Sequence, residues 1–409
     1  MREMVEAKTP WIAAFPSAWG QVPLWALFKE HKNKNLDGIE QNLLSLSYGN
    51  IVRKDINKNT GLLPESFNGY NIVESGDIIL RLTDLQNDHK SLRTGIVTER
   101  GIITSAYLTL RKKVPLDSAY YHYLLYAFDI MKVFYTMGEG IRQSIGYDEL
   151  AYIVVPQPPL SEQHAIVRYL DAKCAAIDEA IERHKKIIEK LEEYRKLKIA
   201  SYTYSFHSVK IGRFLSAVQT GPFGSQLHSE EYIENGIAVI NPASIHDGII
   251  LVDPKCTITD QKAEELSRHH LQIGDIVIGR RGEMGRCAVV KEDGLFCGTG
   301  CFVIKCKEAL LPEYASLCIR STSAVRFLTL NAIGTTMLNL NTDIIMDCPI
   351  PYCDTETQHS IINQVNNVSS KNIDAIQKHQ NIINKLEEYR KSIIYYAVTG
   401  KIDCRETVS

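Results

Sequence analysis

The chain has 409 residues, of which 44% are hydrophobic and 23% charged, with a formal net charge of −2 at pH 7. This composition is typical of a globular protein with two or three domains and excludes a disordered chain. The sequence has no run of 18 apolar residues and no apolar signal core beside Glu3 and Glu6. We therefore expect neither a membrane span nor export, and a cytoplasmic protein.

The first predicted elements are a polar lead-in, residues 1–17, and a strand-rich unit, residues 18–157. Short alternating apolar runs separated by Gly, Asn and Asp turns favour strands, and a helical pattern follows near residues 118–135. The unit ends in a polar loop that contains Arg142, Gln143 and Ser144. Such residues can bind phosphate or base edges, although a Gly-rich surface turn is the simpler alternative.

A long helix is predicted over residues 158–206, because the Pro-containing stretch 155–159 is followed by more than 40 residues without Pro or Gly. Apolar positions alternate in steps of four and three, which is the spacing of a coiled-coil seam. These positions are Leu170, Cys174, Ile177, Ile181, His184, Ile188 and Leu191. The helix therefore needs a partner helix.

The same layout is predicted a second time. A strand-rich unit over residues 207–352 has a helical pattern near residues 312–331 and ends in a polar loop with Thr335, Thr336 and Asn339. A second long helix over residues 353–403 and a tail, 404–409, complete the chain. In this helix Asn372 replaces Ile177, with Ile373 beside it, which we expect to loosen the register locally.

An internal duplication explains this layout. Residues 190–196 and 385–391 are identical, and at the same offset of 195 Gln163 corresponds to Gln358. A weaker match places the Gly-Asp entry to a strand at residues 76–77 and at residues 274–275. The sequence therefore predicts an α+β protein with two strand-rich units and two long helices that pair with each other.

The sequence argues against a zinc site and against an enzyme, and leaves one non-catalytic alternative. Cys287, Cys297, Cys301 and Cys306 have intervals of ten, four and five, which argues against a zinc site. The sequence contains no phosphate-binding loop of the G-x-x-x-x-G-K-[ST] type, and Asn241-Pro242 lacks the second Pro and the aromatic residue that adenine methyltransferases need. A non-catalytic scaffold that binds peptides remains an alternative, because the net charge is nearly neutral.

The segment 156–167, which leads into the helix with the repeated 190–196, resembles the specificity (S) subunit of type I restriction-modification systems. Residues 220–227 and 236–241 also resemble the target-recognition domains of that family. The resemblance implies two target-recognition domains, each binding half of a bipartite, asymmetric DNA site, separated by two antiparallel coiled-coil helices. A specificity-like subunit of another defence system is the alternative within this resemblance.

The resemblance further implies that the chain is not an enzyme and binds no cofactor itself. Two modification subunits would methylate adenine with S-adenosylmethionine, and restriction subunits would use ATP and Mg²⁺. The chain would contact double-stranded DNA and these subunits, and no membrane.

We choose candidate DNA-binding residues from corresponding loops of the two units, because Arg and Gln can make bidentate contacts to bases. They are Arg81, Arg142, Gln143 and Ser144 in the first unit, and Gln226, Arg280, Arg281, Thr335, Thr336 and Asn339 in the second. Candidate partner-binding residues come from the repeated helix segment, where identity suggests two identical partners. They are Glu192, Tyr194 and Arg195, with Glu387, Tyr389 and Arg390.

Overall fold

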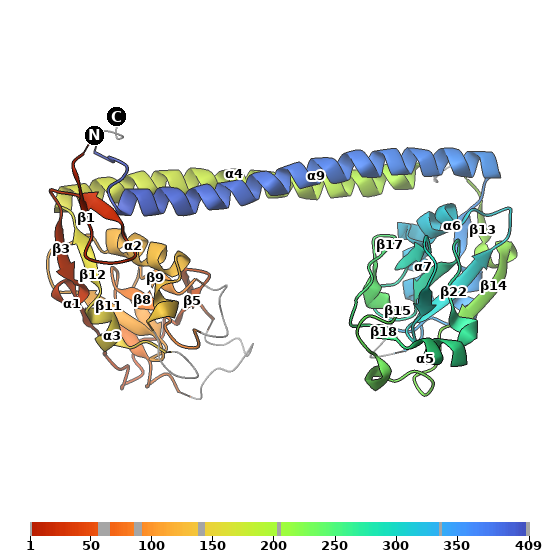
Figure 1. Cartoon of the computed structure of the whole chain (residues 1–409), viewed down its shortest axis with the longest axis horizontal. Coiled ribbons are helices and arrows are strands. Elements are labelled where there is room, and N and C mark those ends of the chain that lie inside the picture. The colour runs from red at the N-terminus through yellow and green to blue at the C-terminus, as the bar shows by residue number, and fades with distance from the viewer. Residues whose placement is uncertain are drawn as a thin grey trace. The chain divides into compact units, whose positions relative to one another are not determined.

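The computed structural model describes residues 2–55, 66–85, 92–137, 144–202, 206–334 and 338–405. The chain forms two compact units, each of which combines a globular part with segments of both long helices. The first unit contains residues 1–185 and 380–409, and the second contains residues 186–379 (Figure 1). Among the described residues, no helix has both the length and the apolarity needed to cross a lipid bilayer.

A four-stranded antiparallel sheet forms the centre of the first unit, in the order β4-β11-β8-β9. Its strands are β4 (Phe28–Glu30), β11 (Leu108–Lys112), β8 (Ile78–Leu80) and β9 (Thr94–Ile96). Further pairs are β1 (Met4–Glu6) with β2 (Ala14–Pro16), β3 (Gly20–Pro23) with β12 (Val154–Gln157), β5 (Leu44–Ser47) with β6 (Asn50–Arg53), and β7 (Asn71–Val73) with β10 (Gly101–Ile103). The helices are α1 (Leu24–Leu27), α2 (Ser118–Ile130), η1 (Val133–Thr136) and α3 (Tyr147–Ala151).

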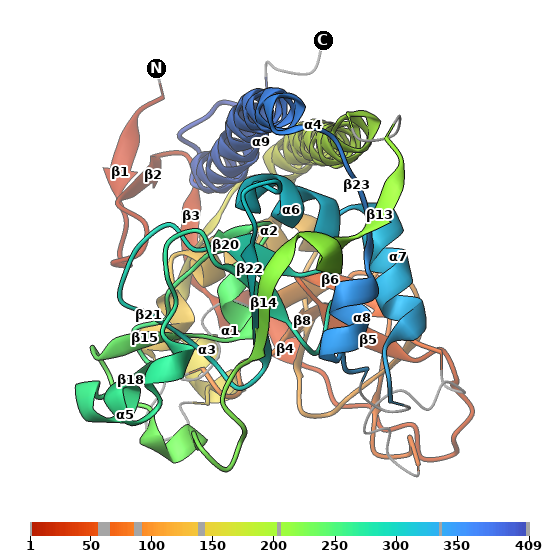
Figure 2. The same cartoon turned by 90° about the vertical axis from the view of Figure 1, so that its right-hand side faces the viewer.

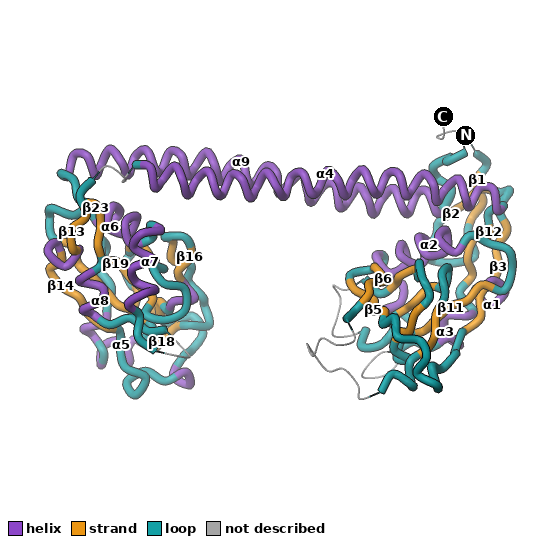
Figure 3. The backbone as a smooth tube through the Cα atoms, turned by 180° about the vertical axis from the view of Figure 1, so that it is seen from behind, coloured by secondary structure: helices purple, strands orange, loops and turns teal. Residues whose placement is uncertain are grey.

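The second unit has the equivalent four-stranded sheet, in the order β14-β22-β19-β20. Strands β14 and β19 of this sheet are labelled in Figure 3. Its strands are β14 (Leu215–Thr220), β22 (Cys301–Cys306), β19 (Ile276–Gly279) and β20 (Cys287–Val289). The other strands are β13 (Ser208–Lys210) with β23 (Pro349–Pro351), β16 (Ile245–His246) with β17 (Ile249–Ile250), and β18 (Thr257–Ile258), β15 (Ile237–Ile240) and β21 (Leu295–Cys297) in one sheet. The helices are η2 (Ile211–Phe214), η3 (Ser229–Glu231), η4 (Pro242–Ser244), α5 (Asp260–Glu265), η5 (Ser267–His269), α6 (Pro312–Ile319), α7 (Thr322–Asn331) and α8 (Thr342–Asp347).

The Gly-Asp repeat occupies the same structural position in both units. Asp77 and Asp275 are buried and precede β8 and β19, and each accepts a hydrogen bond from a backbone N–H three residues upstream, at 2.9 and 3.0 Å. Each also pairs with a cation on the neighbouring strand, Arg111 at 2.6 Å and Lys305 at 3.1 Å. The preceding glycines have φ of 91° and 92°, which favours glycine over other residues. The predicted duplication is therefore confirmed in the globular parts.

The two units differ beside these sheets. In the first unit β10 pairs antiparallel with β7, whereas in the second β21 pairs parallel with β15.

The N-terminal lead-in contains more structure than its polar sequence indicates: β1 and β2 pair, and Ile12 and Phe15 are each only 1% exposed. At its end Trp19 donates a hydrogen bond to the buried Glu162 at the start of the first long helix.

The long helices α4 (Leu160–Ser201) and α9 (Thr355–Val398) lie side by side and antiparallel (Figures 1 and 2). In the first unit Leu170, Ile177 and Ile181 are buried, as the seam predicts, and Arg390 of α9 forms an ion pair with Asp178 of α4. The fold class predicted from the repeat and the resemblance, including the antiparallel coiled coil, is confirmed.

One detail of the seam differs from expectation. Asn372 is itself buried, with 5% exposure, while Ile373 is 51% exposed. The register therefore does not loosen at this point, because Asn372 simply takes the place that Ile177 has in the first copy. The Oδ1 atom of Asn372 has no hydrogen-bond partner in the part of the chain that the structure describes.

The repeated glutamine joins each long helix to its globular part. Gln163 accepts a hydrogen bond from the N–H of Asp117, at the start of α2, and donates to Pro158 O, both at 2.9 Å. Gln358 accepts from the N–H of Leu311, at the start of α6, and donates to the carbonyl of Cys353, at 2.9 and 2.8 Å. Both side chains are buried, so the duplication preserves the whole junction.

Candidate nucleic-acid interface

Several loops of the second unit meet at one edge of its sheets. Backbone hydrogen bonds connect Gly298 to Ile240, and Arg280 to Gly300, at 3.0 and 2.8 Å. The loops approach so closely that a Cβ atom on Gly298 would lie 2.1 Å from the side chain of Asn241. Glycine is needed at this point because the Asn241 side chain occupies the space of a Cβ atom. The Gly298–Gly300 segment is thus a packing element of this edge.

Three of the predicted DNA-binding residues come together at this edge. Arg281 and Asn339 are bridged as neighbouring strand residues, and the N–H of Leu340 donates to Arg280 O at 3.0 Å. The guanidinium of Arg280 lies 5.0 Å from the centre of the Phe302 ring, and burial, followed by the charge of Arg281, lowers the Arg280 pKa. Arg281 is exposed, so its side chain is available to a ligand.

The first unit repeats this arrangement with different side chains. The N–H of Ile145 donates to Leu82 O at 3.0 Å, which is the counterpart of the bond between residues 340 and 280. This bond brings the predicted residues Arg81 and Ser144 to either side of one contact. The following turn also matches, since Asp84 and Gly282 have φ of 55° and 82°. Leu82 corresponds to Arg280, so Arg81 is the counterpart of Gly279.

The remaining predicted residues have other settings. The Gln226 side chain stabilises a local turn, in which its Oε1 atom accepts a hydrogen bond from the N–H of Phe223 at 2.9 Å. Four candidates lie outside the described residues: Arg142, Gln143, Thr335 and Thr336.

The predicted partner-binding residues fall into two groups. Tyr194 and Tyr389 are 55% and 50% exposed, and Glu192 and Glu387 are exposed beside them. The arginines are half-buried and form ion pairs within their own units, Arg195 with Asp247 at 2.5 Å and Arg390 with Asp178.

An exposed isoleucine lies seven residues before each of these tyrosines, and sequence reasoning missed both. Ile187 is 38% exposed and Ile382 is 40% exposed. A spacing of seven residues places each isoleucine on the same helix face as its tyrosine. The signal that could have found them is the repeat itself, because both are Ile at the offset of 195.

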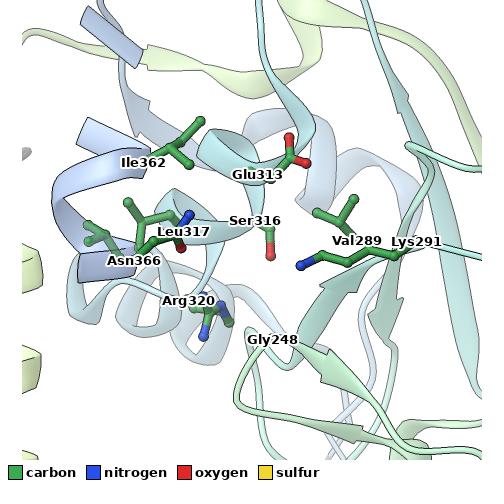
Figure 4. A pocket seen from close by; sticks show the side chains of 10 residues that line it. Gly248, Val289, Lys291, Glu313, Ser316, Leu317, Arg320, Ile362 and Asn366 are labelled. Atoms are coloured by element: carbon green, nitrogen blue, oxygen red, sulfur yellow. The ribbon is translucent and has the colours of Figure 1, made fainter. Parts of the chain in front are cut away.

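A cleft of about 570 Å³ lies in the second unit between the end of α4 and the globular part. Asp247, in the β16–β17 turn, accepts from both Arg195 and Arg320, the latter at 3.0 Å, so two cations meet one carboxylate. A smaller cavity of about 100 Å³ lies between α6 and α9, with Leu317 and Arg320 on one side and Ile362 and Asn366 on the other (Figure 4). Both spaces are places where the long helices contact the second unit.

The cysteines considered for zinc lie in the strands of the second unit. Cys287, Cys297 and Cys301 are buried, and burial raises their pKa values, to about 11 for Cys287 and about 12 for Cys297. Without a metal ion, burial therefore favours the protonated thiols. Within the described ranges no group of three or more His, Cys, Asp or Glu side chains is arranged to hold a metal ion.

Comparison with known proteins gives matches of two kinds. Residues 221–388 match the family described as the type I restriction modification DNA specificity domain. Among solved structures, a chain from a study of complex assembly and conformational transition of the type I R-M system is 14% identical, with a TM-score of 0.73 over 95% of this chain and 99% of that one. The HsdS subunit from Thermoanaerobacter tengcongensis is 15% identical, with a TM-score of 0.53 over 95% and 98%. No curated protein matches the sequence.

The fold and the repeated edge define a protein with two equivalent globular units attached to paired helices. The match to the type I restriction modification DNA specificity domain lies within residues 221–388, and the chain as a whole has the fold of the solved HsdS subunit.

Proposed function

We propose that the chain is the DNA-specificity subunit of a type I restriction-modification assembly, in which each unit reads one half of a split double-stranded DNA site. The observation that carries this proposal is the edge described above, which occurs twice with the same backbone hydrogen bonds, between residues 82 and 145 and between residues 280 and 340. Two like readers in one chain resemble the two half-site readers of a dimeric DNA-binding protein.

The two readers present different side chains at equivalent positions. The second unit places Arg280 and Arg281 where the first has Leu82 and Thr83. Arginine makes bidentate contacts to guanine, whereas threonine makes single hydrogen bonds or contacts the thymine methyl group. The site is therefore asymmetric rather than palindromic.

The chain supplies recognition and no catalytic group, and it acts in the cytoplasm together with its partner subunits. Two modification subunits methylate adenine and carry S-adenosylmethionine, and restriction subunits carry ATP and Mg²⁺. The repeated exposed pairs Ile187 with Tyr194 and Ile382 with Tyr389 support two equivalent seats for two copies of the modification subunit. Apolar and aromatic side chains exposed on a helix are suited to such contacts.

The net charge of −2 bears on how DNA is held. A chain without excess positive charge neutralises few phosphates, so the partner subunits supply most of the backbone contacts. Specific binding with a steep dependence on salt is then expected of the assembled complex and not of the isolated chain.

The test is to map methylated adenines in host DNA with the gene present, with it deleted, and with it restored beside the modification subunit. We expect a motif with two short specified halves and an unread gap, lost on deletion and regained on restoration. An unsplit motif, or a split motif that survives deletion, would refute the proposal. An electrophoretic shift with the modification subunit separates a DNA reader from a scaffold, because only the reader discriminates between sequences.

A further inference from the structure

An arginine precedes the last strand of the four-stranded sheet in each unit. Arg93 comes directly before β9, and Arg286 directly before β20. Their backbones are equivalent: Arg93 O accepts from the N–H of Arg81 at 2.8 Å, and Arg286 O accepts from the N–H of Gly279 at 2.9 Å. Their offset is 193 rather than 195, so the helix repeat does not reveal the pair.

Arg93 is completely buried, with 0% exposure. Its guanidinium donates to three backbone carbonyl oxygens, those of Arg81 at 3.1 Å, Thr83 at 2.9 Å and Asp84 at 3.3 Å. Its Nε donates to the hydroxyl of Tyr135 at 2.9 Å. A buried cation is costly unless its donors are satisfied, and here the three carbonyl acceptors all belong to the 81–84 loop. Arg93 thus holds the segment that passes Ser144 at the proposed reading edge.

Arg286 holds the corresponding edge of the second unit by a different loop. Its guanidinium donates to Pro242 O at 3.0 Å and pairs with Glu283 at 2.8 Å. Pro242 packs against Gly300, where an added Cβ would lie 2.8 Å from its ring, and Gly300 O accepts the N–H of Arg280. The arginine therefore supports, through Pro242 and Gly300, the backbone that presents Arg280.

We propose that this repeated arginine is a positioning residue in each unit, which fixes the reading loops and so determines the base preference of that unit's half-site. The inference rests on the proposed function. Arg93 is buried, and the Arg286 guanidinium is engaged by Pro242 O and Glu283, so each acts through the backbone it holds rather than by touching DNA.

Lysine cannot replace arginine in this role. The guanidinium has five N–H donors in a planar fork, and Arg93 uses this fork to bridge three carbonyl groups, whereas the ammonium of lysine is a single point. Elsewhere in the repeat the substitution has occurred: Arg111 pairs with Asp77 where Lys305 pairs with Asp275. Arg111→Lys is therefore a matched control, since the chain itself shows that lysine serves at that position.

The experiment expresses Arg93→Lys, Arg286→Lys and Arg111→Lys as full chains with the modification subunits, and maps methylated adenines in host DNA. In Arg93→Lys we expect discrimination at one or more positions of one half-site to fall about 10-fold, with the other half unchanged; Arg286→Lys should relax the opposite half. Arg111→Lys should leave both halves unchanged. Tyr135→Phe, which removes only the Nε partner, should relax the same half as Arg93→Lys by a smaller factor, and provides the reading if Arg93→Lys does not fold.

Two outcomes would overturn the inference about the arginines. Motifs that stay unchanged in Arg286→Lys and Tyr135→Phe would mean that the arginines do not set base preference. Equal weakening of both halves, together with a lower melting temperature, would mean a general role in folding. A wild-type chain that yields no split motif would instead refute the proposed function.

Discussion

Replacing the repeated glutamine should detach each long helix from its globular part. Gln163 and Gln358 are 3% and 0% exposed, and each bonds a backbone N–H at the start of a short helix and a backbone carbonyl ahead of the long helix. Replacement by alanine leaves these two backbone groups without partners in a buried place, and in Gln358→Ala a third, because Gln358 also donates to Ala309 O at 3.0 Å. Each such group costs about 1–3 kcal/mol, so Gln163→Ala should lose roughly 2–6 kcal/mol of unfolding free energy and Gln358→Ala roughly 3–9 kcal/mol.

Urea denaturation followed by circular dichroism measures this loss in Gln163→Ala and Gln358→Ala. The matched control is Gln364→Ala, since Gln364 is an exposed glutamine of α9 that bonds only Ser360 on its own helix. Surface substitutions of this kind change stability by about 0.5 kcal/mol or less. If both glutamine variants were as stable as the control, the junction would not be what fixes the helices to the units.

Three further predictions concern the helices and the first unit. Asn372→Ile should stabilise the chain by about 1–3 kcal/mol in thermal unfolding, because it removes a buried oxygen without a partner and Ile177 shows that isoleucine fits; a lower melting temperature would contradict this. Four residues inserted within 180–190 and four within 375–385 of the paired helix should lengthen the helix pair by roughly 6 Å. Methylation mapping should then show an unread gap that is wider by about two base pairs. An unchanged gap in an active complex would show that the helices do not determine the gap length. Burial lowers the pKa of His122 to about 4, so below pH 6.5 the unfolded chain binds more protons than the folded chain. The unfolding free energy should therefore fall by about 3 kcal/mol between pH 6.5 and pH 4, and His122→Gln should remove this loss. Equal pH slopes of the unfolding free energy in the variant and the unaltered chain would refute this.

The sequence predicts well what the duplication marks. The starts of both long helices, the seam and the Gly-Asp turns follow from a repeated pattern, because a helix or tight turn is determined by local residues. The C-terminal ends do not, since α4 ends at Ser201 and α9 at Val398, five residues before the predicted ends. The sequence predicts a looser register at Asn372 because a polar residue interrupts the apolar pattern of the seam, yet Asn372 is buried. In the structure Asn372 occupies the seam position that Ile177 has in the first copy, and its side chain stays buried.

Other features depend on contacts between distant residues, and the sequence could not indicate them. Nothing near Arg93 shows that a charged residue will be fully buried, since its partners lie on a loop that precedes it and on Tyr135. Likewise, the parallel pairing of β15 with β21 has no local signal. Arg280, Arg281 and Asn339, which the sequence selects as polar residues of loops, do lie at one edge, although the counterparts of the two arginines are Leu82 and Thr83.

The repeated arginines show how the duplication has diverged. In the first unit Arg390 pairs with Asp178 of the facing helix, but the counterpart of Asp178 is Ile373, which offers no charge. In the second unit Arg195 pairs instead with Asp247 of the globular part. The same seven letters therefore serve different internal contacts in the two copies, so those contacts do not explain why the letters are identical. What the copies share is the exposed face beside these arginines, and the two equivalent seats proposed above would account for the identity.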